Sequence, residues 1–159
     1  MEKTANNLRN TIIQTVPLFQ QITNEAASFK ISPEKWSTKE IVGHLIDSAA
    51  NNHQRFVRLQ YNETLIFPKY EQEEWVSNQH YNDADWQNLI SLWQSFNLHL
   101  AFMMEKTPSD KLQRSVEIGG SKPFTLEFIM NDYVEHLKHH LKSIFPELSI
   151  VSKFENIYK

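Results

Sequence analysis

The chain has 159 residues, of which 40% are hydrophobic and 22% charged, with only three glycines and no cysteine. This length supports a single domain spanning 1–159, and the scarcity of glycine favours long helices over a strand-and-turn fold. A net charge of −3 gives no electrostatic case for nucleic-acid binding, which needs clustered Lys and Arg, and without cysteine there is no disulfide, thiolate nucleophile or sulfur metal ligand.

The N-terminal residues 1–7 lack the long apolar core of a signal peptide. No run approaches the roughly 18 apolar residues of a membrane span. We therefore expect a cytoplasmic protein that does not associate with membranes.

The first two helices are predicted from apolar residues spaced three and four apart. The first pattern covers about 4–29, and Pro17 inside it predicts a kink or a split into two segments. The second covers about 36–60. Its start carries Ser37 as N-cap and Glu40 three residues later, which together form a capping box.

The second helix has a histidine at the edge of its apolar face. At about 100° of rotation per residue, the apolar side chains fall between roughly 60° and 160° from His44. His44 therefore lies on the flank of the buried stripe. The polar side chains within about 40° of it on the same flank are Ser48, Asn51 and Arg55.

The helical period fails between residues 61 and 81. A structureless connection of this length is unusual in a compact domain, and its aromatic residues argue against disorder. We predict an ordered crossover over one end of a bundle, with Tyr70 and Trp75 forming a pocket wall or a subunit contact. The glutamates are expected to form a solvated acidic edge: Glu71, Glu73 and Glu74.

A third helix is predicted from an Asn82 or Asp83 cap to about residue 106, with Trp86 and Trp93 packed in the core, as we also expect for Trp36. Thr107-Pro108 ends it. The next segment, 108–124, alternates briefly and contains adjacent glycines. It is typical of a small hairpin or extended turn rather than a sheet.

The last helix is predicted over 125–145, with Thr125 as N-cap and Pro146 as the stop. Taking His136 as zero, the apolar stripe lies between roughly 80° and 180°, and His140 lies at about 40° on its flank. His139 points about 60° the other way. Two imidazoles one turn apart form half of a metal site. For the tail, residues 149–159, the pattern leaves the order open.

Four long amphipathic helices with a long crossover predict an all-α four-helix bundle. If its helices pack suitably, His44 meets His136 and His140, and three histidines from two helices are the ligand count of an open, catalytic-type site. Imidazoles suit Zn²⁺, Ni²⁺ or Fe²⁺. The alternatives are that the pair consists of surface imidazoles, or that His139 replaces His140 as the partner of His136.

Three other polar residues on the second helix have two interpretations each. Asp47, about 60° from His44, either orients a ligand or acts as general base, or it is a solvated helix residue. Asn51 and Arg55 either hold an anionic substrate group or belong to a surface salt bridge.

Four stretches of the sequence resemble one known family, in this order along the chain: Trp36-Ser-Thr-Lys-Glu-Ile-Val-Gly-His44-Leu-Ile-Asp47, Asn51-Asn-His-Gln-Arg55-Phe, Tyr70-Glu-Gln-Glu-Glu-Trp75-Val and Tyr133-Val-Glu-His136-Leu-Lys-His-His140. The chain resembles the DinB/YfiT-like superfamily of metal-dependent enzymes over roughly residues 7–146.

The resemblance implies a four-helix bundle of the DinB/YfiT-like type, a homodimer, and one divalent metal per chain, zinc or nickel, bound by His44, His136 and His140. Some members of the family transfer a low-molecular-weight thiol to an electrophile, and others are described as hydrolases. We therefore expect an enzyme acting on a small molecule, with thiol S-transfer first and metal-dependent hydrolysis second. The opposing interpretation is a non-catalytic stress protein in which the metal only fixes the bundle.

Overall fold

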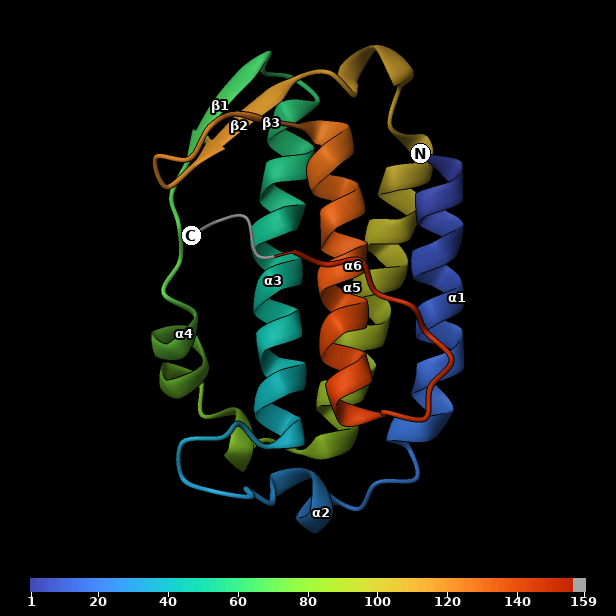
Figure 1. Ribbon diagram of the computed structural model, residues 1–159, viewed down its shortest axis with the longest axis vertical. Coiled ribbons are helices and arrows are strands. Elements are labelled where there is room, and N and C mark those ends of the chain that lie inside the picture. Colours follow the sequence, from blue (N-terminus) through green and yellow to red (C-terminus); the bar gives the residue numbers. More distant parts are fainter. Residues whose placement is uncertain (156–159) are drawn as a thin grey trace.

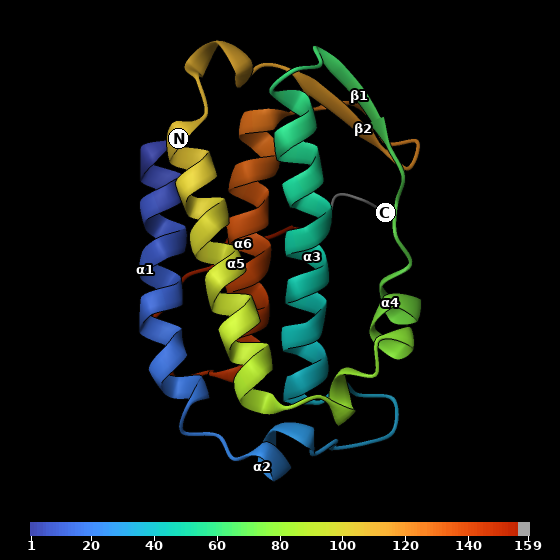
Figure 2. The ribbon, with the colours of Figure 1, turned by 180° about the vertical axis from the view of Figure 1, so that it is seen from behind.

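The computed structural model describes residues 1–155 and shows a bundle of four long helices (Figures 1 and 2). In ring order around the bundle, each beside the next, they are α1 (Glu2–Phe19), α5 (Trp86–Lys106), α3 (Thr38–Leu59) and α6 (Leu126–Ile144). Helices α1 and α6 run in one direction, and α3 and α5 in the other (Figure 1). Because the consecutive long helices α3 and α5 are parallel, the chain between them must return along the bundle. The predicted all-α bundle with a long crossover is confirmed.

The first connection differs from the prediction in where the helix divides. Helix α1 continues through Pro17 and ends at Phe19, and the short helix α2 (Asn24–Ser28) follows with Thr23 as N-cap. The Thr23 hydroxyl accepts a hydrogen bond from the Ala26 amide at 3.2 Å. The predicted split is therefore present, but Pro17 lies in the last turn of α1 rather than at the break.

The crossover is ordered, as predicted, but it runs along the flank of α3 rather than over one end of the bundle (Figure 1). It contains strand β1 (Thr64–Phe67), helix α4 (Gln72–Asn78) and a single 3-10 turn (Tyr81–Asp83). The predicted acidic edge is exposed at the start of α4. Negative charge there is favourable because the helix N-terminus carries partial positive charge.

The small hairpin predicted for residues 108–124 is present, but contrary to the prediction it belongs to a sheet. Strand β1 pairs in parallel with β2 (Ser115–Ile118), which pairs in antiparallel fashion with β3 (Phe124–Thr125). In this register Thr64 lies opposite Ser115, and Ser115 opposite Thr125. The sheet therefore joins the crossover to the connection that leads into α6.

The helix starts follow their capping residues. Ser37 and Glu40 form the predicted capping box, with the Ser37 amide donating to Glu40 Oε2 at 2.8 Å. Thr125 caps α6 as predicted, whereas α5 begins after Asp85, later than the predicted Asn82 or Asp83. Within residues 1–155, no helix combines the length and the apolar character needed to cross a membrane.

The core confirms the aromatic packing predicted for α5. Trp86 and Trp93 are buried, and each meets the ring of Phe19 edge-on, at 5.5 and 5.2 Å between ring centroids. Between α5 and α6, Tyr133 Oη donates to Asn97 Oδ1 at 2.5 Å, and Asn97 Nδ2 donates to the Trp93 carbonyl at 2.8 Å. Both partners of this polar bridge are buried.

We expect Tyr133→Phe to lower the free energy of unfolding by about 1–3 kcal/mol, because it leaves Asn97 Oδ1 buried without its donor. Urea unfolding followed by circular dichroism measures this loss. The matched control is Tyr61→Phe, since Tyr61 is 66% exposed. Tyr61→Phe should change the free energy of unfolding by no more than about 0.5 kcal/mol. Equal losses in the two variants would contradict the prediction.

Candidate metal centre

Three imidazoles converge between α3 and α6. The Nε2 atom of His136 lies 3.3 Å from Nε2 of His44 and 3.1 Å from Nε2 of His140. The candidate ligand atoms all lie within 4.8 Å of one another. Two nitrogens that each lie about 2.0–2.1 Å from one tetrahedral zinc ion are about 3.3 Å apart. The spacing of the imidazoles therefore fits one shared ion.

Helix packing accounts for this convergence. His44 is 1% exposed, and His136 and His140 are half-buried one turn apart on α6. His139 is exposed and lies outside the group, although its ring is near that of His140, at 5.4 Å between centroids. The structure thus brings together the three predicted histidines and leaves out their competitor.

The surroundings of the imidazoles include contacts that the sequence did not reveal. Trp36, predicted as core, is half-buried with its ring 5.1 Å from that of His44. Ser48 Oγ lies 3.5 Å from Nδ1 of His136. A side chain at the second nitrogen of a ligand histidine fixes its tautomer and orientation. In the sequence, the signal for this contact was the position of Ser48 one turn after His44 on the same helix.

Burial controls the charge of the three imidazoles. Burial, together with the nearby His140, lowers the pKa of His44 to about 3. Burial, together with the nearby His139, lowers the pKa of His140 to about 4. The pKa of His136 is lowered well below its ordinary value, first by burial and then by the neighbouring histidines. All three are therefore neutral at pH 7, and the neutral imidazole is the form that binds metals.

Asp47 is held by the crossover. Its Oδ1 atom accepts hydrogen bonds from Tyr81 Oη and from Gln79 Nε2, both at 2.7 Å. Its other oxygen, Oδ2, is buried with no hydrogen-bond partner among residues 1–155. Burial raises the pKa of the Asp47 carboxyl, and the two hydrogen bonds act against that rise. Asp47 is only 2% exposed, so the alternative that it is a solvated helix residue is wrong.

A glycine permits the close approach of the crossover to α3. A Cβ atom added at Gly43 would lie 2.1 Å from the ring of Tyr81. No side chain fits in that space, so the glycine lets the Tyr81 ring pack directly against the helix. The Tyr81 hydroxyl thereby reaches Asp47, one turn along α3 from Gly43.

Asn51 and Arg55 are also buried, at 7% and 6% exposure, which rules out a surface salt bridge. Asn51 Nδ2 donates to the Asp47 carbonyl at 2.9 Å. Arg55 donates to Asn52 Oδ1 at 3.3 Å, and its guanidinium lies over the ring of Phe67 at 5.0 Å.

A groove of about 740 Å³ lies between α3 and the crossover. Its walls include both aromatic residues predicted to form a pocket wall or a subunit contact, Tyr70 and Trp75, whose ring centroids are 5.3 Å apart. Burial and the charge of Asp47 raise the pKa of Tyr70 to about 12, while Arg55 and Ser48 lower it. The Tyr70 hydroxyl therefore stays protonated. Asn51 also lines the groove, which places it beside the Asp47 network.

We expect the metal-free protein to lose stability as the pH falls from 7 to 5. The folded-state pKa of His44 is about 3, against an ordinary value of 6.5. Below pH 6.5 the unfolded chain therefore binds more protons, and His44 alone lowers the free energy of unfolding by about 2 kcal/mol at pH 5. Urea unfolding at the two pH values tests this. In His44→Gln the loss of unfolding free energy between pH 7 and pH 5 should be smaller by about 2 kcal/mol. An unchanged pH dependence would contradict the assignment of this loss to His44.

Comparison with known proteins places the chain in a family. The sequence pattern of the DinB superfamily matches residues 7–144. Over 115 residues the chain is 27% identical to YfiT of Bacillus subtilis (strain 168), a proposed metal-dependent hydrolase; the match covers 72% of this chain and 64% of that protein. The chain thus spans less than two thirds of this relative.

Solved structures show the same fold. The structure of YfiT from Bacillus subtilis, described as having an unusual four-helix bundle topology, superposes with a TM-score of 0.80 at 20% identity, covering 91% of this chain and 83% of that one. A mycothiol-dependent maleylpyruvate isomerase superposes with a TM-score of 0.67 at 10% identity, covering 95% of this chain and 61% of that one. By its sequence pattern, and with the bundle that these structures share, the chain belongs to the DinB superfamily.

Proposed function

We propose that the protein is a metal-dependent enzyme that binds one divalent ion per chain through His44, His136 and His140. The observation that carries this proposal is the convergence of three Nε2 atoms at ligand spacing. The metal dependence ascribed to YfiT supports it. Because the ligands are nitrogens and the chain has no cysteine, the set suits zinc or nickel.

Three histidines leave coordination positions vacant. An ion held there supplies positive charge that lowers the pKa of a bound water or thiol toward neutrality. We assign to Asp47 the role of general base that accepts the proton of this water or thiol. Its Oδ2 atom is buried without a hydrogen-bond partner among residues 1–155, and its raised pKa brings the carboxyl closer to neutral pH. Asn51 and Arg55 are proposed to position the substrate where α3 borders the groove.

The first choice of reaction is transfer of a low-molecular-weight thiol to an electrophile. A chain without cysteine must take its thiol from a small molecule, and a mycothiol-dependent isomerase shares the fold. Metal-dependent hydrolysis is the second choice, supported by the description of YfiT. A purely structural ion is less favoured, because structural zinc normally has a fourth protein ligand and the group among residues 1–155 comprises three.

The partner is proposed to be a small molecule, and the protein a cytoplasmic homodimer. Exposed apolar side chains on the crossover support a subunit contact there, since Ile66 is 82% and Trp75 39% exposed. Light scattering at micromolar concentration measures the mass, and a monomer would refute the dimer without affecting the metal centre.

The reaction is tested by supplying metal-loaded protein with thiols and a chromogenic electrophile, and separately with ester and amide substrates. Turnover should disappear in His44→Ala and persist in the control His99→Ala, an exposed histidine on α5. Asp47→Asn should keep the metal and lose about 10²–10⁴-fold in kcat. If no substrate reacts and metal removal sharply lowers the melting temperature, the structural interpretation replaces the enzyme.

A further inference from the structure

The segment that follows α6 rises in front of α1, crosses in front of α6 and ends beside α3 (Figure 1). We call residues 149–155 the strap. Ile150 is 7% exposed and anchors its start, whereas the next residue, Val151, is 73% exposed. The start of the strap is therefore anchored at Ile150, and the chain comes to the surface directly after it.

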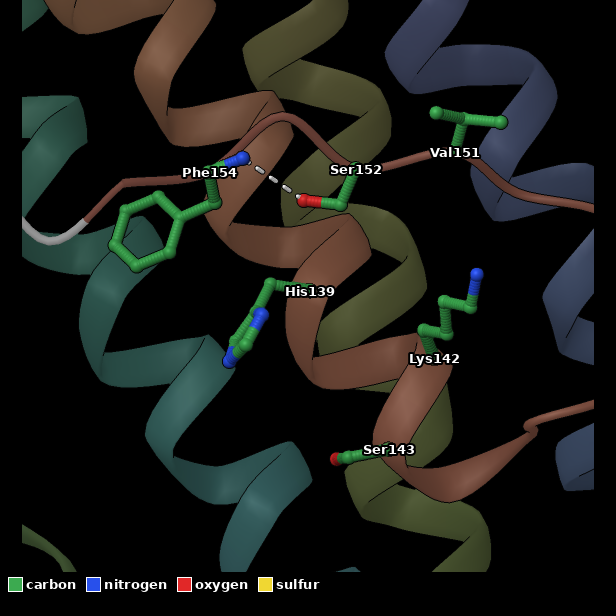
Figure 3. A pocket seen from close by; sticks show the side chains of 6 residues that line it. All are labelled: His139, Lys142, Ser143, Val151, Ser152 and Phe154. Atoms are coloured by element: carbon green, nitrogen blue, oxygen red, sulfur yellow. Dashed lines mark hydrogen bonds between the residues drawn. The ribbon is translucent and has the colours of Figure 1, made fainter.

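One glutamate of α6 holds the strap in place. The Glu135 carbonyl accepts a hydrogen bond from Ser152 Oγ at 2.9 Å, and Glu135 Oε2 accepts one from the Lys153 amide at 2.7 Å. The Phe154 amide donates in turn to Ser152 Oγ at 3.1 Å (Figure 3). Glu135 directly precedes His136, so the strap is attached next to a candidate ligand.

The aromatic side chain of the strap covers this ligand. The ring of Phe154 lies 5.0 Å from the ring of His136 and 5.6 Å from that of His139, between centroids. Phe154 is itself half-buried. It therefore shields the side of His136 that would otherwise face solvent, and it gives His139 an aromatic contact outside the convergent group.

An open surface pocket of about 370 Å³ lies between α6 and the strap; Figure 3 shows the lining residues, which are His139, Lys142, Ser143, Val151, Ser152 and Phe154. The hydrogen bonds that hold the strap to Glu135 are part-buried or exposed, and a short surface segment held by so few bonds opens at a small fraction of the free energy of global unfolding. The strap can thus lift while the bundle stays folded.

We propose that the strap is a lid of the metal centre, in which Phe154 limits the size of molecules that approach the ion beside His136. Ser152 and Glu135 form its latch. This inference rests on the proposed metal site and adds the residue that selects its substrate by size.

The test uses cobalt-loaded protein, whose visible absorption reports ligands that enter the open coordination positions. Imidazole and the bulkier 4-phenylimidazole are titrated separately. In Phe154→Ala the affinity for 4-phenylimidazole relative to imidazole should rise about tenfold, the size of effect that one aromatic contact makes. Phe154→Trp should lower the ratio. The control Phe102→Ala, at a 53% exposed phenylalanine on α5, should leave it unchanged.

A second measurement reports opening of the latch. Ser152→Ala removes the hydroxyl that joins Glu135 to Phe154, and a chromogenic chelator should then capture cobalt several-fold faster than from the wild type. Unchanged selectivity in Phe154→Ala, with one equivalent of cobalt bound, would overturn the lid and leave the metal centre standing. A wild-type chain that binds no cobalt would overturn both.

Discussion

His136→Ala is expected to weaken divalent-metal binding by more than about 100-fold, because removal of a mere outer-shell partner already costs about 10–100-fold. His136 is the central one of the three proposed ligands: its Nε2 atom lies within 3.3 Å of Nε2 of both His44 and His140. Elemental analysis of the purified protein, followed by titration of the metal-free form, measures the loss.

The matched control is His139→Ala, three residues further along the same helix. Its exposed imidazole lies outside the convergent group, so the variant should retain one equivalent of metal. Retention in His136→Ala together with loss in His139→Ala would show that the ligand set is wrong. Circular dichroism of both variants separates lost ligation from lost folding.

Gly43→Ala is expected to destabilise the protein even though alanine is the better helix former. The new Cβ would lie 2.1 Å from the Tyr81 ring. Overpacking of this kind costs about 1–3 kcal/mol, occasionally more, against a gain of about 1 kcal/mol in helix propensity. We therefore expect a net loss in the free energy of unfolding, measured by urea unfolding. The loss is larger the less the crossover can move away from the added methyl group. Displacement of Tyr81 would also remove a donor from Asp47.

A double-mutant cycle identifies the cause. Tyr81→Ala removes the ring that the added methyl would strike, so the Gly43→Ala substitution should be neutral or stabilising in that background. If instead the two losses simply add, the clash is not responsible and the cost arises elsewhere in α3.

Local signals predicted much of the fold. The capping box at Ser37 and the cap at Thr125 fixed two helix starts, because a side chain that accepts from a nearby amide acts within one turn. The helical period also placed His136 and His140 on one flank of α6. Pairing them with His44 needed the further assumption that α3 and α6 are neighbours, which the structure confirms.

The contacts that were missed all depend on residues distant in sequence. Strand β1 is four residues long, too short for a period, and it forms by pairing with β2 about fifty residues later. The hydrogen bond from Tyr81 to Asp47 likewise follows from the path of the crossover, which no local pattern encodes. Phe154, in a tail without helical period, carries no signal of its contact with His136.

The proposed ligands are far apart along the chain, so metal binding at this site would report the order in which the helices assemble. His44 and His136 are 92 positions apart, so the complete site exists only after α6 has docked on α3. If that docking is already formed in the folding transition state, added metal will accelerate refolding. If docking comes later, metal will leave the refolding rate unchanged and only slow unfolding. Stopped-flow refolding with and without the ion thus distinguishes an early from a late α3–α6 pair.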